Sequence, residues 1–184
     1  DTLGDIAASM NAALARGGFP PRPVNAYRQM VGGGVAALAR RALPAGCGDE
    51  AARSTEEFMR EEYTRRGADT TRPYAGVREL LDGLRGAGVR RAVLSNKPDD
   101  FTVRLCDRFF ASDDFEIVLG AREGVPKKPD PAAALSIARD LCIDPARFLY
   151  LGDSGTDMKT ALAAGMHPVG ALWGFRDAEE IAAA

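Results

Sequence analysis

The sequence has little of what metal–thiolate, disulfide and serine-hydrolase chemistry requires. Its 184 residues include three cysteines and one histidine. Cys47, Cys106 and Cys142 are widely spaced and form no Cys-x-x-Cys pair, which argues against a zinc site and a disulfide framework. His167 has no histidine or cysteine partner at ligand spacing, so we expect a loop or packing role for it. Ser95 is not part of a Gly-x-Ser-x-Gly sequence and is a poor candidate for an acyl-transfer nucleophile.

Excess charge and long hydrophobic runs are also missing. The 24 basic and 26 acidic residues give a net charge of -2, which leaves no broad positive surface for nucleic acid. The apolar runs are too short to cross a membrane, and the first residues show no signal-peptide pattern. We therefore expect a soluble, cytoplasmic protein without nucleic-acid or membrane partners. The oligomeric state cannot be predicted.

The first part of the chain has the periodicity of helices. Apolar residues recur there at spacings of three and four, and glycine and proline separate the stripes. The stripes fall within Ile6–Leu14, Tyr27–Val31, Val35–Ala42 and Glu57–Tyr63. We predict a small all-helical domain over residues 1–70.

From Pro73 onward, helical and strand patterns alternate. This alternation predicts right-handed crossovers and a parallel sheet, so the expected class is α/β, with a Rossmann-like core over residues 71–184. Asp130 and Pro131 should start one of its helices as the N-cap and the first-turn residue. The expected strands are Val89–Leu94, Phe115–Leu119, a buried Phe148–Leu151 and Val169–Leu172.

Two carboxylates stand where the third of these strands meets the next helix. Asp153 follows the strand directly, and Asp157 lies about one helical turn further on. Ligands of open α/β sheets gather at the carboxyl ends of the strands, and paired carboxylates suit Mg²⁺. The alternative is that Asp153 caps the helix and Asp157 is solvated. The spacing by itself does not decide between them.

Polar residues follow the first strand and precede the Asp130 helix. The hydroxyl of Ser95, with neighbouring backbone N–H groups, can hold a phosphoryl oxygen, although Ser95-Asn96 is also an ordinary loop sequence. Lys127 and Lys128 offer a cation that could neutralise a phosphate. A solvated basic turn is the alternative, and it suits Lys127 better.

In this order, the motifs resemble a known family. Ser95-Asn96, Lys128-Pro129-x-Pro131 and Gly152-Asp153-Ser154-x-x-Asp157 resemble motifs two, three and four of the haloacid dehalogenase superfamily. The helical first part resembles the cap domain of its phosphoglycolate phosphatase-like branch. The resemblance covers nearly the whole chain and implies a Mg²⁺-dependent phosphatase for a small phosphorylated metabolite such as phosphoglycolate.

The resemblance also implies roles for single residues. Ser95 and Asn96 would bind the transferring phosphoryl group, and Lys128 would stabilise its charge, with Ser95 and Lys128 as catalytic residues. Asp153 would ligate Mg²⁺, and Asp157 would complete or support the metal site. The cap would close over the strand ends, with its glycines near the substrate unless they form a plain helix-to-helix turn; these are Gly32, Gly33 and Gly34.

One family motif does not occur in the sequence. Motif one, Asp-x-Asp-Gly-Thr, would carry the nucleophilic aspartate, the acid/base aspartate and the central first strand, and Asp1-Thr2-Leu3 resembles the residues that normally come after this motif. We therefore expect this segment directly upstream of Asp1. Two alternatives stay open: a phosphomutase of the β-phosphoglucomutase type, and a catalytically dead binding or regulatory module if the nucleophile is truly absent. A dehalogenase is less favoured, because halide displacement needs no metal-binding carboxylate pair.

Overall fold

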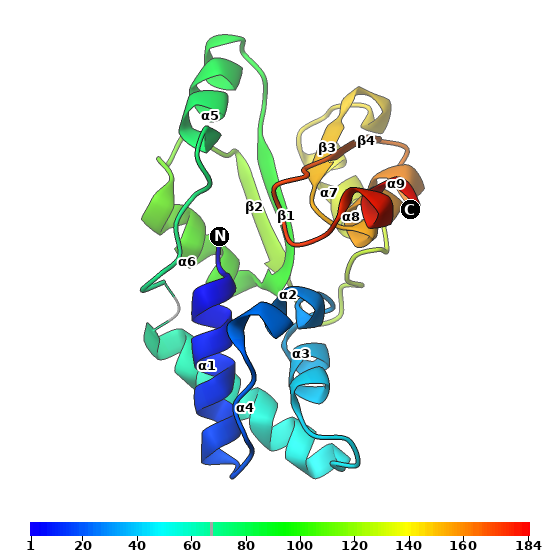
Figure 1. Cartoon of the computed structure of the whole chain (residues 1–184). Coiled ribbons are helices and arrows are strands. Elements are labelled where there is room, and N and C mark those ends of the chain that lie inside the picture. The colour runs from blue at the N-terminus through cyan, green and yellow to red at the C-terminus, as the bar shows by residue number, and fades with distance from the viewer. Residues whose placement is uncertain (67) are drawn as a thin grey trace. The chain divides into compact units, whose positions relative to one another are not determined.

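The computed structural model describes residues 1–66 and 68–184, which form two compact units, residues 1–84 and 85–184 (Figure 1). The boundary lies inside helix α5, Val77–Gly86. Whether the functional division falls at residue 70, between a cap and a catalytic core, stays a prediction. Within the described part of the chain, no helix is both long and apolar enough to span a membrane.

The first unit is helical, as its periodicity predicts. The longest helices, α1 and α4, pack against each other, and α1 buries Met10 and Leu14 completely. Gly17 and Gly18 end α1, and Gly18 has a φ of 75°, which suits glycine. The helices before α5 are α1 (Leu3–Arg16), η1 (Val24–Ala26), α2 (Tyr27–Met30), α3 (Val35–Ala42) and α4 (Asp49–Arg66).

A buried carboxylate joins the first helix to the segment after α4. Asp5, only 2% exposed, accepts hydrogen bonds from the backbone N–H and hydroxyl groups of both Thr70 and Thr71. The distances from the hydroxyl oxygens are 2.9 Å for Thr70 and 2.6 Å for Thr71. Because a buried charge is costly without partners, these four donors explain how α1 tolerates Asp5 on its buried face.

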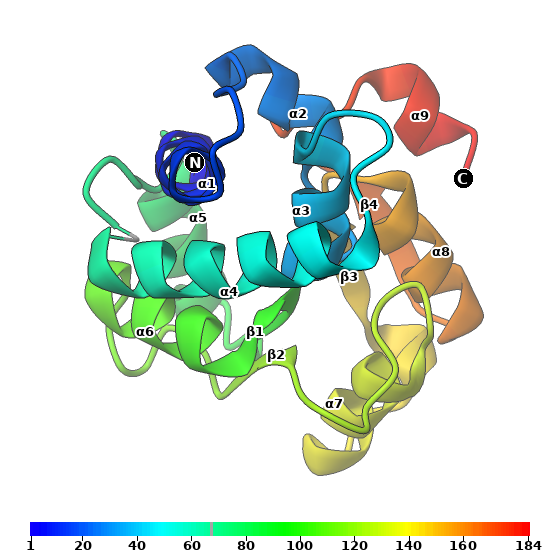
Figure 2. The same cartoon turned by 90° about the horizontal axis from the view of Figure 1, so that it is seen from below.

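The second unit alternates strands and helices and has only parallel strand pairs among its described residues. Strand β1 pairs with β2, and β3 pairs with β4. Figure 2 shows α6 beside the first pair, and α7 and α8 beside the second. The predicted α/β class with a Rossmann-like parallel core is confirmed. Its elements are β1 (Ala92–Pro98), α6 (Asp99–Phe109), β2 (Ile117–Ala121), α7 (Ala132–Asp140), η2 (Pro145–Arg147), β3 (Leu149–Gly152), α8 (Gly155–Ala163), β4 (His167–Gly170) and α9 (Ala178–Ala182).

The core of this unit lies between α7, α8 and the strands. Small side chains of the two helices pack together with Met166, and Leu94, Phe148 and Tyr150 pack against them. The prediction of a fully buried third strand is wrong. Leu149 and Leu151 are 75% and 48% exposed, because successive strand residues point to opposite faces and only the face of Tyr150 meets the helices.

The strand ends also differ from the predicted ones. β1 begins at Ala92 instead of Val89, and β4 ends at Gly170, which pairs with the last residue of β3. Apolar runs suggested the predicted ends, whereas strand pairing determines the observed ones. Helix α7 starts one residue later than predicted: Pro131 is its N-cap, and the Asp130 carboxylate accepts a hydrogen bond from the N–H of Ala132.

Candidate active site

The predicted phosphate-binding segment lies inside β1 and not after it. The pairing of β1 with β2 is regular up to Leu94, which faces Leu119, and resumes only where Pro98 faces Ala121. Three residues of β1, positions 95–97, therefore stand against the single residue Gly120, in an irregular, bulged strand end. Such an irregularity turns backbone and side chains out of the sheet at its carboxyl edge, where the sequence places the site.

Gly120 makes this bulge possible. A Cβ atom on Gly120 would lie 2.4 Å from the Cα atom of Asp99 and 2.7 Å from the carbonyl oxygen of Lys97. The Gly120 N–H donates a 2.7 Å hydrogen bond to the Asp99 carboxylate. The close approach of the two backbones therefore requires glycine at this position.

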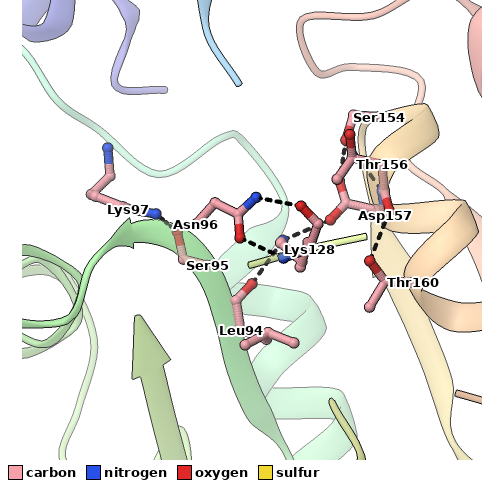
Figure 3. A network of polar contacts seen from close by, with 9 residues as sticks. All are labelled: Leu94, Ser95, Asn96, Lys97, Lys128, Ser154, Thr156, Asp157 and Thr160. Carbon is pink, nitrogen blue, oxygen red and sulfur yellow. Dashed lines mark hydrogen bonds and ion pairs between the residues drawn. The ribbon is translucent and has the colours of Figure 1, made fainter. Parts of the chain in front are cut away.

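The amide side chain of Asn96 holds the backbone of Lys128. Its Oδ1 accepts from the Lys128 N–H at 2.9 Å, and its Nδ2 donates to the Lys128 carbonyl at 3.0 Å (Figure 3). This two-way pairing joins segments 32 residues apart. The Asn96 side chain thus positions the lysine, and its direct contact with a phosphoryl group stays a prediction.

The Lys128 ammonium lies at the centre of the site. Its Nζ donates to the Leu94 carbonyl at 3.0 Å and lies 2.7 Å from Oδ1 of Asp157. The side chains of this ion pair are only 12% and 8% exposed. Lys127, by contrast, is exposed, as expected if it belongs to a solvated basic turn. Among the two neighbouring lysines, the structure therefore brings Lys128 to the strand ends.

Asp157 is buried and uses both carboxylate oxygens. Oδ1 pairs with Lys128, and Oδ2 accepts a 2.6 Å hydrogen bond from the hydroxyl of Ser154. Ser154 is the N-cap of α8, so the alternative of a capping Asp153 and a solvated Asp157 is wrong. Burial, followed by the charge of Asp157, raises the pKa of the buried Tyr150 hydroxyl. The Asp157 carboxylate therefore binds Lys128 and Ser154 and contributes to the raised pKa of Tyr150.

Asp153 leaves β3 directly, as predicted, and lies against the turn after β4. Its Oδ2 accepts from the N–H of Phe175 at 3.3 Å. A Cβ on Gly174 would lie 2.3 Å from that same oxygen, so glycine is needed for the approach. Across the two described stretches, 1–66 and 68–184, no three His, Cys, Asp or Glu side chains are close enough together to form a metal-binding group.

The triple glycine belongs to the first unit. Gly32, Gly33 and Gly34 connect α2 to α3, and their φ angles are 120°, 75° and 92°. Nη1 of Arg41 donates to the carbonyls of Met30 and Gly32, both at 2.9 Å. Hydrogen bonds within its own unit therefore hold the loop, and its position beside a substrate stays a prediction.

Sequence reasoning missed two groups that complete the site. The Leu94 carbonyl has no residue-type signal, since any residue in the strand would offer it. Ser154 does have one: serine directly before a helix is a preferred N-cap, and here its hydroxyl oxygen accepts from the Asp157 N–H and its hydroxyl donates to the Asp157 carboxylate.

Comparisons with known proteins agree with this fold and identify the family. The family model described as a haloacid dehalogenase-like hydrolase matches residues 3–165, and the chain belongs to this family. A phosphoglycolate phosphatase of Pseudomonas putida KT2440 is 34% identical over 186 residues, which cover 98% of this chain and 68% of that protein. One from Pseudomonas fluorescens Pf0-1 is 35% identical over 190 residues, covering 99% and 68%.

A solved structure has the same fold as this chain. The crystal structure of a predicted phosphoglycolate phosphatase from Haemophilus somnus 129Pt superposes with a TM-score of 0.90 and is 26% identical. The match covers 99% of this chain and 84% of that one. The confirmed parallel-strand architecture is therefore shared with known members of the family.

Proposed function

We propose that the protein is a phosphatase that hydrolyses a small phosphorylated metabolite of the phosphoglycolate type. The observation that carries this proposal is the buried Lys128–Asp157 pair at the carboxyl ends of the strands, beside Ser95 and Asn96. Family membership and the phosphoglycolate phosphatases among the relatives support the reaction and the substrate class.

Each residue then has a task in binding and positioning. Ser95 offers a hydroxyl to a phosphoryl oxygen, and the Lys128 ammonium neutralises negative charge that develops during phosphoryl transfer. Asn96 and Asp157 fix the backbone and the ammonium of that lysine. A cation that is already in place when the charge develops stabilises the transition state without reorganisation.

Mg²⁺ fits this site through Asp153. Mg²⁺ in phosphate-processing sites is commonly held by one or two carboxylates, with water and substrate phosphate supplying the other ligands. Asp153 is a half-buried carboxylate at the strand end, whereas both oxygens of Asp157 have protein partners. We therefore assign Asp153 as the metal ligand. Asp157 supports the site indirectly, because it holds the Lys128 ammonium in place. When bound, Mg²⁺ would supply charge neutralisation at the phosphoryl oxygens.

The test is phosphate release by the protein expressed from its complete gene. Wild-type protein should release inorganic phosphate from 2-phosphoglycolate and other small monoesters when Mg²⁺ is present. Lys128→Ala should lower kcat by about two to three orders of magnitude, as loss of a preorganised electrostatic donor does, and Lys127→Ala should change it only slightly. The reverse ranking would overturn the assignment. A phosphate-bearing isomer in place of inorganic phosphate would favour the phosphomutase.

A further inference from the structure

Ser154 contacts Asp157 twice, once at the helix backbone and once at the carboxylate. The Asp157 N–H donates to Oγ of Ser154 at 3.4 Å, and Oγ lies 2.6 Å from Oδ2 of Asp157 (Figure 3). Because the N–H group can only donate, Oγ accepts there, and its own hydrogen goes to the carboxylate. A hydroxyl-to-carboxylate hydrogen bond of this length is charge-assisted. Capping α8 therefore leaves the hydroxyl hydrogen of Ser154 for a second task.

The second task is to orient the Asp157 carboxylate. The torsion that rotates an aspartate carboxylate about its Cβ–Cγ bond is broad, so the oxygens need partners to define their direction. Close packing against Gly152 restricts where Cβ of Asp157 lies, but it does not define this rotation. With Oδ2 held by Ser154, Oδ1 faces the Lys128 ammonium at 2.7 Å. The Ser154 hydroxyl thus determines which oxygen meets the lysine.

The orientation of Asp157 in turn directs the Lys128 ammonium. An ammonium has three hydrogens, and in the part of the chain that the structure describes two of them go to the Leu94 carbonyl and to Oδ1 of Asp157. Because the ammonium is tetrahedral, two fixed hydrogen bonds also fix the direction of the third hydrogen. A hydroxyl at the start of α8 therefore controls the direction in which Lys128 can donate to a ligand.

We propose that Ser154 is a positioning residue for phosphoryl transfer, whose hydroxyl aims the Lys128 ammonium at a phosphoryl oxygen by fixing the Asp157 carboxylate. This inference rests on the proposed phosphatase function. Ser154 acts through Asp157 and Lys128, so loss of its hydroxyl should weaken the stabilisation of charge that develops in the transition state. Such a loss lowers kcat and leaves KM nearly unchanged.

The experiment separates the hydroxyl from the helix cap. Glycine is a tolerated N-cap residue, so Ser154→Gly removes the hydroxyl while α8 stays capped. With 2-phosphoglycolate, this variant should lower kcat by at least about tenfold and keep KM within about threefold, as misplacement of a catalytic group does. Ser154→Thr keeps a hydroxyl and should retain most of kcat. Asp144→Gly removes the capping side chain of η2 and is the matched control, with kcat unchanged.

A second comparison tests the route through Lys128. In the Lys128→Ala background, Ser154→Gly should lower kcat by less than about twofold further, because the group that it positions is gone. The Mg²⁺ concentration for half-maximal activity should be the same in Ser154→Gly and wild type, which separates this effect from one on the neighbouring Asp153. A full additional loss in the Lys128→Ala background, or a kcat that excess Mg²⁺ restores, overturns the inference.

The remaining outcomes are equally decisive. An unchanged kcat in Ser154→Gly, or an equal fall in Ser154→Thr, also overturns the positioning role. Ser154→Ala serves the same comparisons if the glycine variant does not fold. If wild-type protein hydrolyses no phosphate monoester, the proposed function fails, and a crystal structure of Ser154→Gly then decides whether the hydroxyl orients Asp157. The contact between Asp157 and Lys128 should open beyond about 3.5 Å, and an unchanged contact would overturn the inference.

Discussion

Gly152 and Asp157 are packed so closely that only glycine fits at the end of β3. A Cβ on Gly152 would lie 2.2 Å from Cβ of Asp157 and 2.6 Å from its carboxylate carbon. Gly152→Ala should therefore push Asp157 away from Lys128. We expect a loss of about 1–3 kcal/mol in the free energy of unfolding, the usual cost of overpacking, together with a fall in kcat.

Gly83→Ala is the matched control for this substitution. Gly83 lies in α5 with open space around the position of a Cβ atom. Alanine there should stabilise the helix by about 0.5–1 kcal/mol and leave kcat unchanged. Denaturant unfolding and phosphate release, measured on both variants, check the pair. Wild-type behaviour of Gly152→Ala would show that the turn relaxes without moving the carboxylate.

The Lys128–Asp157 pair should be strongly coupled. Each of Lys128→Met and Asp157→Asn leaves a buried partner without its counterpart, so each should cost on the order of 3 kcal/mol. The double variant should lose clearly less than the sum, with a coupling energy of at least about 1 kcal/mol. A double-mutant cycle in urea measures this energy. Strict additivity would mean that the contact contributes nothing to stability.

Asp153 should control the response to Mg²⁺. Asp153→Asn removes one negative charge from the assigned ligand and keeps its shape, so Mg²⁺-stimulated phosphate release should disappear while the circular dichroism spectrum stays that of wild type. Asp140→Asn, at the exposed end of α7, is the control and should keep the full response. Normal stimulation of Asp153→Asn by Mg²⁺ would contradict the assignment.

The Asp5 clamp predicts a pH dependence of stability. Burial raises the pKa of the Asp5 carboxyl, but the hydrogen bonds from Thr71 and Thr70 outweigh burial, and the pKa lies below its ordinary 3.8. A lowered folded-state pKa stabilises the protein above the unfolded value, and this contribution disappears as the pH falls through the folded pKa. The stability difference between wild type and Asp5→Asn should therefore be largest above pH 3.8 and shrink below it.

Unfolding free energies measured across the acid range test this directly. Asp49→Asn is the control, because Asp49 is a largely exposed residue that pairs with Arg40 at the surface. Its difference from wild type should be small and nearly constant with pH. A constant difference for Asp5→Asn as well would mean that the four hydrogen bonds do not favour the charged form.

The helices were predictable because their signals are local. The apolar spacing of Ile6, Met10 and Leu14, with glycines after it, identifies α1 from a single stretch of sequence. Strand ends were not predictable in the same way. Gly170 ends β4 because it pairs with Gly152, and no pattern near Gly170 states where β3 ends. Pairing between distant segments determines such boundaries.

The site residues also divide into those that a local sequence pattern predicts and those that depend on contacts between distant segments. The position of Asp153 after a strand follows from local pattern, and so does the place of Asp157 one turn into a helix. The pairing of Asn96 with the Lys128 backbone does not, because it depends on how a bulge in β1 meets a loop 32 residues later. The family resemblance identified both residues without indicating that one holds the other.

The fixed ammonium of Lys128 affects how a ligand would associate. A mobile lysine samples many rotamers, and ordering it costs up to about 2 kcal/mol in conformational entropy. Here Asn96, the Leu94 carbonyl and Asp157 order the lysine when the chain folds. An arriving oxyanion therefore meets a cation that has already lost its rotational freedom. Its association should carry a smaller entropic penalty than association with a lysine that moves freely in water.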